Sequence, residues 1–146
     1  MSQDKCGISM AEVLFEEIII PAWGTLYHLT RIPSKLRTYP RSYDSRGKSV
    51  VWRPAEPLNG FVCACDCERI DTAISVEVFG RYGVQDRTQL LVKWTRLEVA
   101  AKLLNVPVLE ILQKHGLDLE SMTGLRHMTF MTITWASHIV SLGCYA

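Results

Sequence analysis

Two of the four histidines in the chain are followed two positions later by a threonine. The pairs are His28 with Thr30 and His127 with Thr129. Because residues two positions apart in a strand face the same side of a sheet, each pair would place an imidazole beside a hydroxyl. An imidazole can exchange a proton with a reacting oxygen, and a hydroxyl can bind a phosphate oxygen. The spacing predicts catalytic roles for these four residues, with a structural role for each histidine as the alternative.

A basic segment, residues 31–53, follows His28. It holds seven basic side chains and a single acid, Asp44. Guanidinium groups bind phosphates through paired hydrogen bonds, and aromatic side chains among them can stack on bases. The segment is therefore expected to contact a nucleotide-containing ligand, or a protein or nucleic-acid target, with a solvated loop as the alternative. The basic residues are Arg31, Lys35, Arg37, Arg41, Arg46, Lys48 and Arg53.

Hydrophobic spacing, prolines and glycines predict one α+β domain over residues 1–146, with a mixed or mostly antiparallel sheet and packed helices. Residues 31–60, rich in proline and glycine, are expected to form a long loop with one short strand. The expected strands cover residues 26–32, 49–52, 61–67, 89–94 and 126–135. The expected helices cover residues 11–20 (a helix, or a helix running into a strand), 68–80, 97–104 and 108–114. The tail, residues 137–142, is expected to pack on this body.

Three cysteines alternate along an expected strand, at Cys63, Cys65 and Cys67. Zinc sites normally need four ligands and use Cys-x-x-Cys spacing, which this run lacks. We therefore expect no metal site and interpret the thiols as small hydrophobic side chains.

A helix-turn-helix spacing occurs at residues 101–111, with Asn105 as the expected cap of the second helix. The second helix begins with apolar and acidic residues, whereas reading DNA needs basic or amide side chains. Two packed core helices are the expected structure.

The composition is that of a globular protein, with 48% hydrophobic residues, 21% charged residues and a net charge of +1. The first residues lack the charged-then-apolar order of a signal peptide, and the longest apolar run is too short to span a bilayer. The sequence therefore predicts a cytoplasmic protein with no membrane contact. Five cysteines, an odd number, are expected to be thiols.

The stretch Leu26-Tyr27-His28-Leu29-Thr30 resembles the opening strand of ADP-ribosyltransferase-like domains, in which a Tyr-His-x-Thr strand lies against NAD. The following basic loop, strand, helix and strand are in a similar order, and residues 130–140 resemble the closing strand of such domains. The resemblance implies an ADP-ribosyltransferase-like fold that binds NAD or a related nucleotide and can transfer ADP-ribose to a macromolecule. It implies that Tyr27, His28, Thr30 and Arg31 contact the cofactor.

Both His-x-Thr motifs also resemble those of the two-histidine phosphoesterases, which act on cyclic phosphates and on 2′,5′- or 3′,5′-linked oligonucleotides. That resemblance implies that His28, Thr30, His127 and Thr129 share one phosphate. A non-catalytic interaction or inhibitor protein, using the basic segment as its binding surface, is the third hypothesis.

Overall fold

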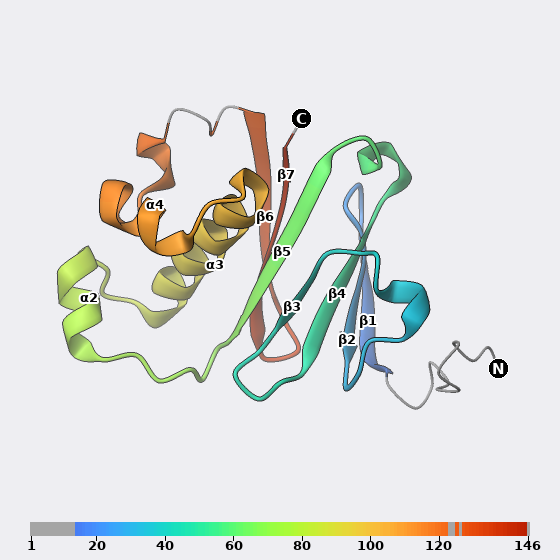
Figure 1. The fold of residues 1–146 in the computed structure, drawn as a ribbon. Coiled ribbons are helices and arrows are strands. Elements are labelled where there is room, and N and C mark those ends of the chain that lie inside the picture. Colours follow the sequence, from blue (N-terminus) through green and yellow to red (C-terminus); the bar gives the residue numbers. More distant parts are fainter. Residues whose placement is uncertain (1–13, 123–124, 126, 146) are drawn as a thin grey trace.

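Two antiparallel β-sheets pack against each other and share one hydrophobic core (Figure 1). The computed structural model describes residues 14–122, 125 and 127–145. The first sheet has the strand order β1-β2-β4-β3, and the second has the order β5-β7-β6. The predicted α+β class is therefore confirmed at this level. The strands are β1 (Leu14–Ile20), β2 (Gly24–Leu29), β3 (Arg41–Tyr43), β4 (Ser49–Pro54), β5 (Val62–Arg69), β6 (Met128–Trp135) and β7 (His138–Tyr145).

The shared core lies between the inner faces of the two sheets. The first sheet contributes Leu26, Val50 and Trp52, whose exposed fractions are at most 1%. The second sheet contributes Cys65, Cys67, Val140, Leu142 and Cys144. Because side chains alternate along a strand, His28 lies on the same inner face as Leu26. Burial of this apolar area supplies most of the energy that holds the sheets together.

The outer face of the first sheet is also covered. Tyr27, Leu29 and Val51 pack there with Leu36, which belongs to the short 3-10 helix at Ser34–Leu36. The two faces of β2 therefore pack against different parts of the chain. His28 faces the second sheet, whereas Tyr27 faces the loop that follows β2.

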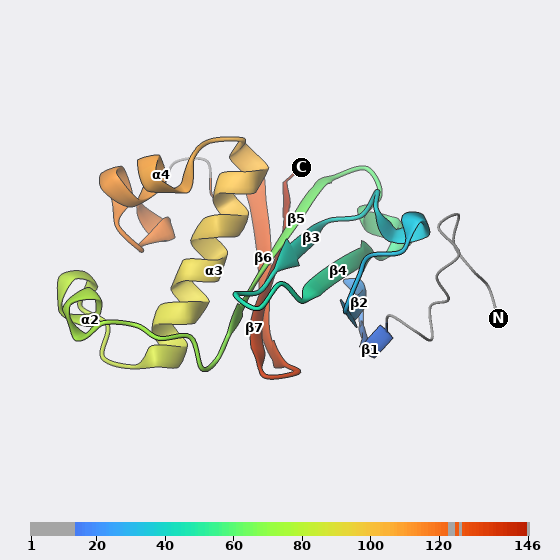
Figure 2. The same ribbon diagram turned by 60° about the horizontal axis from the view of Figure 1, so that its bottom comes forward.

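The second sheet is covered on its outer face by α3 (Arg87–Leu104), and α2 (Val76–Tyr82) and α4 (Val108–His115) pack on α3 (Figure 2). Gly143 on β7 lets α3 approach closely, because a Cβ atom there would lie 2.5 Å from the Cγ1 atom of Val99. Within the described part of the chain, no helix combines the length and apolar character needed to cross a membrane.

Residues 89–94 are helical, so the predicted strand there is wrong. They form the first turns of α3, which the side chain of Asp86 caps by accepting a hydrogen bond from the backbone N–H of Thr88 at 3.1 Å. Leu90, Trp94 and Leu97 share a helix face that packs on α2 and α4. A short apolar run fits a strand or a buried helix equally well, and tertiary packing determines that residues 89–94 are helical.

The predicted helix over residues 68–80 is wrong in its first half. Strand β5 continues to Arg69 because Glu68 and Arg69 pair with Ile139 and His138 of β7. Only α2, from Val76 to Tyr82, is helical.

Residues 14–20 form a strand, β1, where a helix or a helix running into a strand is predicted. They pair with β2 in a hairpin. Residues 11–13 lie outside the described part of the chain.

The segment predicted as a long loop with one short strand, residues 31–60, contains two paired strands, β3 and β4. The other predicted elements are confirmed with shifted ends. The first, second and third predicted strands correspond to β2, β4 and β5, and the last corresponds to β6. The tail is more than a packed segment, since β7 is the central strand of the second sheet. Asn105 ends α3 in a left-handed conformation, with φ 54°, instead of capping α4, whose N-terminal cap position is Pro107.

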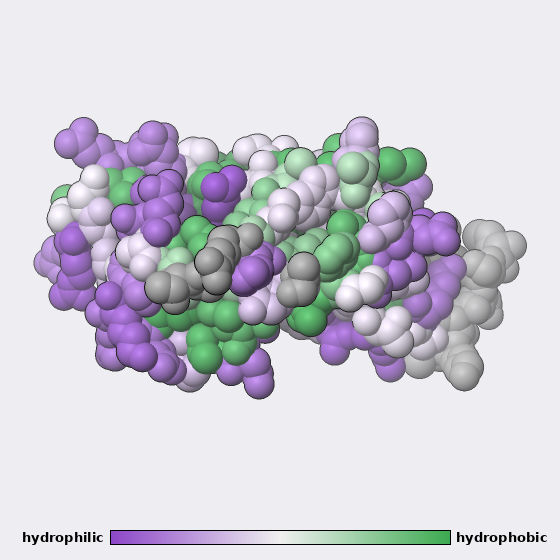
Figure 3. Space-filling model, turned by 90° about the horizontal axis from the view of Figure 1, so that it is seen from above, coloured by the Kyte–Doolittle hydropathy of each residue, from purple (hydrophilic) through white to green (hydrophobic). Residues whose placement is uncertain are grey.

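Apolar side chains gather over the middle of the face seen in Figure 3, with hydrophilic side chains toward both ends. Phe61, which directly precedes β5, and Val62, its first residue, are exposed at 40% and 56%.

Candidate functional site

His28 meets side chains of the second sheet at one end of the shared core. The centroid of its ring lies 5.0 Å from that of His138 and 6.2 Å from that of Trp135, with near-perpendicular ring planes. The imidazole is half-buried. Burial and the neighbouring His138 lower the pKa of His28 below its ordinary value of 6.5, against the opposing attraction of Asp44.

Asp44 follows β3 and its carboxylate is held by its own loop. The Oδ1 atom accepts hydrogen bonds from the backbone N–H groups of Arg46 at 2.8 Å and Lys48 at 2.9 Å. This turn leaves the Oδ2 atom to face His138. Burial alone would raise the pKa of Asp44, but hydrogen bonds from His138 and from the two amides outweigh it and hold the pKa below 3.8.

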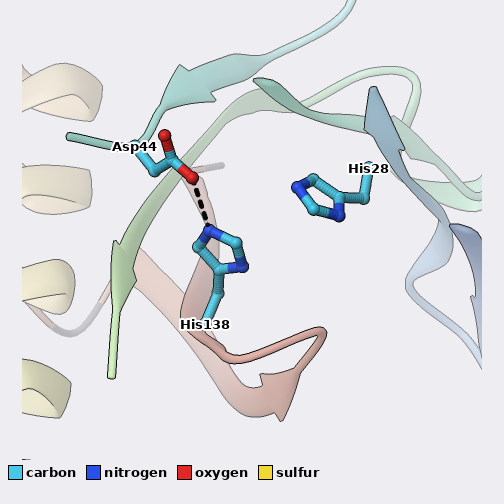
Figure 4. A group of neighbouring side chains, drawn as sticks. All are labelled: His28, Asp44 and His138. Carbon is cyan, nitrogen blue, oxygen red and sulfur yellow. Dashed lines mark hydrogen bonds and ion pairs between the residues drawn. The ribbon is translucent and has the colours of Figure 1, made fainter. Parts of the chain in front are cut away.

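His138 is the first residue of β7 and is fixed at both ring nitrogens. Its Nδ1–H group donates to the carbonyl oxygen of Ala136 at 2.6 Å, and its Nε2 atom lies 2.9 Å from the Oδ2 atom of Asp44 (Figure 4). The two contacts fix the orientation of the ring between the turn before β7 and the loop after β3. The ring is 1% exposed. We call His28, Asp44 and His138 the His–Asp–His cluster.

The guanidinium of Arg69 lies near the His–Asp–His cluster. The Nη1 atom of Arg69 is 3.9 Å from the Oδ2 atom of Asp44. The same guanidinium is paired with Asp71, whose Oδ1 atom is 2.9 Å from its Nε atom. The charge of Arg69 is therefore shared between an exposed acid and the buried one.

A second candidate site is a pocket of about 610 Å³ beside the end of β2. We call it the arginine pocket, because three arginines line it. It is lined by Thr30, Arg31, Ile32, Arg37, Arg41, Tyr43, Gly47 and Ser49. It therefore combines two of the residues predicted to bind the cofactor with part of the basic segment.

The arginine pocket and His28 belong to opposite faces of the first sheet. Arg41 pairs with Val51, and Val51 packs in the outer cluster with Tyr27. Directly opposite residues of paired strands share a face, so Arg41 points outward. His28 pairs with Val50, which packs in the inner core. His28 and Arg41 therefore lie on opposite faces of the first sheet.

The other predicted site residues lie elsewhere. Tyr27 is 6% exposed in the outer cluster, with the guanidinium carbon of Arg53 5.8 Å from its ring centroid. It packs as a core residue.

His127 directly precedes β6 and Thr129 is its second residue. The ring centroids of His127 and Tyr145 are 6.3 Å apart. His28 contacts Trp135, at the opposite end of β6. Eight residues of strand span about 25 Å. The two His-x-Thr motifs therefore do not meet at one phosphate.

The interpretation of the alternating cysteines as small hydrophobic side chains is confirmed for Cys65 and Cys67, each 1% exposed in the shared core. Burial raises the pKa of the Cys67 thiol to about 12. Cys63 is partly buried beside them, with its Sγ atom 3.5 Å from that of Cys144.

Sequence reasoning missed Asp44 and His138 as site residues. The signal available for Asp44 was a turn-forming Asp-Ser-Arg-Gly run beside a strand. His138 stands directly after the two-residue turn of the last hairpin, and nothing in the sequence links it to Asp44. No protein family, no curated protein and no solved structure matches the chain. Its function is therefore inferred from the geometry of the two sites.

Proposed function

We propose that the chain binds a nucleotide with a pyrophosphate group in the arginine pocket, as an ADP-ribosyltransferase-like protein with NAD as its first candidate ligand. The observation that carries this proposal is that Arg31, Arg37 and Arg41 line one pocket. A guanidinium offers paired donors that match phosphate oxygens, and such charge-assisted bonds are about twice as strong as neutral ones.

The other lining residues support a nucleotide. The hydroxyl of Thr30 can donate to a phosphate oxygen, and Tyr43, whose side chain is 58% exposed, offers a ring for a base or nicotinamide to stack on. None of the described lining residues is acidic. The volume is within the range of about 300–1,000 Å³ that is usual for small-molecule sites.

Transfer of ADP-ribose is a further part of the proposal and needs its own measurement. A carboxylate normally stabilises the positive charge that develops on the ribosyl carbon. The described lining of the arginine pocket contains none. Binding is therefore the activity that the pocket itself supports, and transfer requires an acid from the target or from elsewhere in the chain.

Calorimetric titration with NAD, ADP-ribose and AMP tests the binding. We expect NAD and ADP-ribose to bind more tightly than AMP, because the pyrophosphate can engage more than one guanidinium. Arg31→Gln and Arg41→Gln should each weaken binding by about 10-fold or more. Arg81→Gln, an exposed arginine on α2 outside the pocket, is the matched control and should change the affinity less than about twofold.

Two results would overturn the proposal. One is that about 1 mM NAD or ADP-ribose gives neither binding heat nor a rise in melting temperature. That concentration is on the order of the weakest dissociation constant expected for a specific site. The other is binding that Arg81→Gln weakens as much as Arg41→Gln does. Incorporation of labelled ADP-ribose into a protein or nucleic-acid mixture measures transfer separately.

A further inference from the structure

The His–Asp–His cluster brings together three side chains that bind metal ions. One ligand atom from each of His28, Asp44 and His138 lies within 4.8 Å of the other two. The side chains come from β2, from the loop after β3 and from the first position of β7, and they point toward one another (Figure 4). Two imidazoles and a carboxylate form a common donor set for Zn²⁺ and similar first-row divalent ions.

Two of these ligands are already oriented by outer hydrogen bonds. Histidines that bind metals usually donate their other ring N–H to a carbonyl or carboxylate, which fixes the ring. His138 does this through its Nδ1–H bond to Ala136, which aims its Nε2 atom into the cluster. The Oδ1 atom of Asp44 is held by the amides of Arg46 and Lys48, which aims its Oδ2 atom at the same point.

The turn that presents His138 is strained. Ala136 and Ser137 both have positive φ, at 52° and 62°. Positive φ at both central positions is the geometry of a two-residue hairpin turn, which non-glycine residues adopt at an energetic cost. Here the conformation places the carbonyl oxygen of Ala136 against the imidazole of His138.

The distances suit an ion after a small opening of the cluster. Zinc bonds to nitrogen and oxygen are about 2.0–2.1 Å long, so two ligands of a tetrahedral ion are about 3.3 Å apart. The Nε2 atom of His138 and the Oδ2 atom of Asp44 are 2.9 Å apart. The ion would replace the proton between them, and its charge would be opposed by Arg69, which Asp71 partly neutralises.

We propose that His28, Asp44 and His138 bind one Zn²⁺ ion, with water as the fourth ligand. His28 and Asp44 belong to the first sheet and its loop, and His138 belongs to the second. The ion therefore ties the two sheets together at this end of their shared core. The site is independent of the arginine pocket, which lies on the other face of the first sheet.

Titration of the metal-free full chain with Co²⁺, followed by displacement with Zn²⁺, tests the proposal. We expect one equivalent of Co²⁺ to give the visible absorption of a tetrahedral nitrogen and oxygen site, without a thiolate charge-transfer band. Zn²⁺ should raise the melting temperature of the wild-type chain by about 5–10 °C at 100 times its dissociation constant. The shift in melting temperature is measured on the wild-type chain, so it does not depend on whether a variant folds.

His28→Gln should weaken Co²⁺ binding by about 30-fold or more, since it removes a direct ligand but leaves the contact between Asp44 and His138 intact. His115→Gln, at the end of α4, is the control and should bind as the wild type does. The proposal is overturned by the absence of stoichiometric binding, by a thiolate band that assigns the ion to the cysteines, or by equal affinity of His28→Gln and the wild type.

Discussion

The Nε2 atom of His138 lies 2.9 Å from the Oδ2 atom of Asp44, although the two residues are 94 positions apart in the chain. The side chains are 1% and 0% exposed, so water does not screen them. The contact joins a loop of the first sheet to the central strand of the second. It therefore couples the formation of one sheet to that of the other.

Removing the charge of Asp44 should destabilise the fold strongly. Asp44→Asn leaves His138 facing an amide. Removing one charged partner of a buried pair lowers the free energy of unfolding by about 3–5 kcal/mol. Urea unfolding in the presence of EDTA measures this cost without any contribution from metal. Asp71→Asn removes an exposed partner of Arg69 and should change the stability by less than about 1 kcal/mol. Equal effects of the two variants would contradict the buried-pair interpretation.

Asp66 should make the protein less stable as pH rises from about 4 to 7. Burial raises the pKa of its carboxyl from 3.8 to about 7, against the attraction of Lys102, whose Nζ atom is 3.6 Å away. The folded state therefore holds a proton that the unfolded state releases in this range. The stability that this proton provides is full below pH 4 and is lost as pH rises through 7.

Asp66→Asn should remove this pH dependence. The variant should match the wild type near pH 4 and exceed it at pH 8 by on the order of 2 kcal/mol, below the limit of about 4 kcal/mol set by the pKa difference. Urea unfolding of both proteins between pH 4 and 8 measures the difference. A variant less stable than the wild type at pH 8 would show that the ion pair with Lys102 outweighs the cost of burial.

Gly143→Ala should weaken the packing of α3 on β7. The added methyl group would lie 2.5 Å from the Cγ1 atom of Val99 and 3.2 Å from side-chain atoms of Leu103 and Phe130. Val99 is stiff and buried, so we expect a loss of about 2 kcal/mol in urea unfolding. Gly60→Ala adds a methyl group in open space and should change little. An unchanged stability of Gly143→Ala would mean that α3 can shift outward freely.

The buried thiols should react slowly in the native protein. Burial raises the pKa values of Cys67 and Cys144 to about 12, and only the thiolate attacks an alkylating reagent. At pH 8 we expect iodoacetamide to modify them at least about 100-fold more slowly than in concentrated urea. Mass spectrometry of the separated peptides measures the extent of alkylation at each cysteine. Native and unfolded rates within tenfold of each other would contradict this burial.

Two strands of the first sheet, β2 and β4, and part of the lining of the arginine pocket could be predicted from the sequence. The pattern of residues 26–32 predicted a strand, which is β2 with a shifted end, and Thr30 and Arg31, both predicted to contact the cofactor, line a pocket with part of the basic segment. These features are local, because they depend on strand periodicity and on residues close in the chain. The assignment of residues 89–94 to a strand failed because a short apolar run fits both kinds of element.

By itself, the sequence determined features that depend on residues close in the chain: the strands β2 and β4, the basic segment and the helix α4. Only the tertiary structure decided which side chains meet. It separated His28 from His127 and from the arginine pocket, and it placed His28 beside Asp44 and His138. The physical reason is that these contacts depend on how two sheets stack, which is set by the packing of Leu26, Trp52 and their partners over long chain separations.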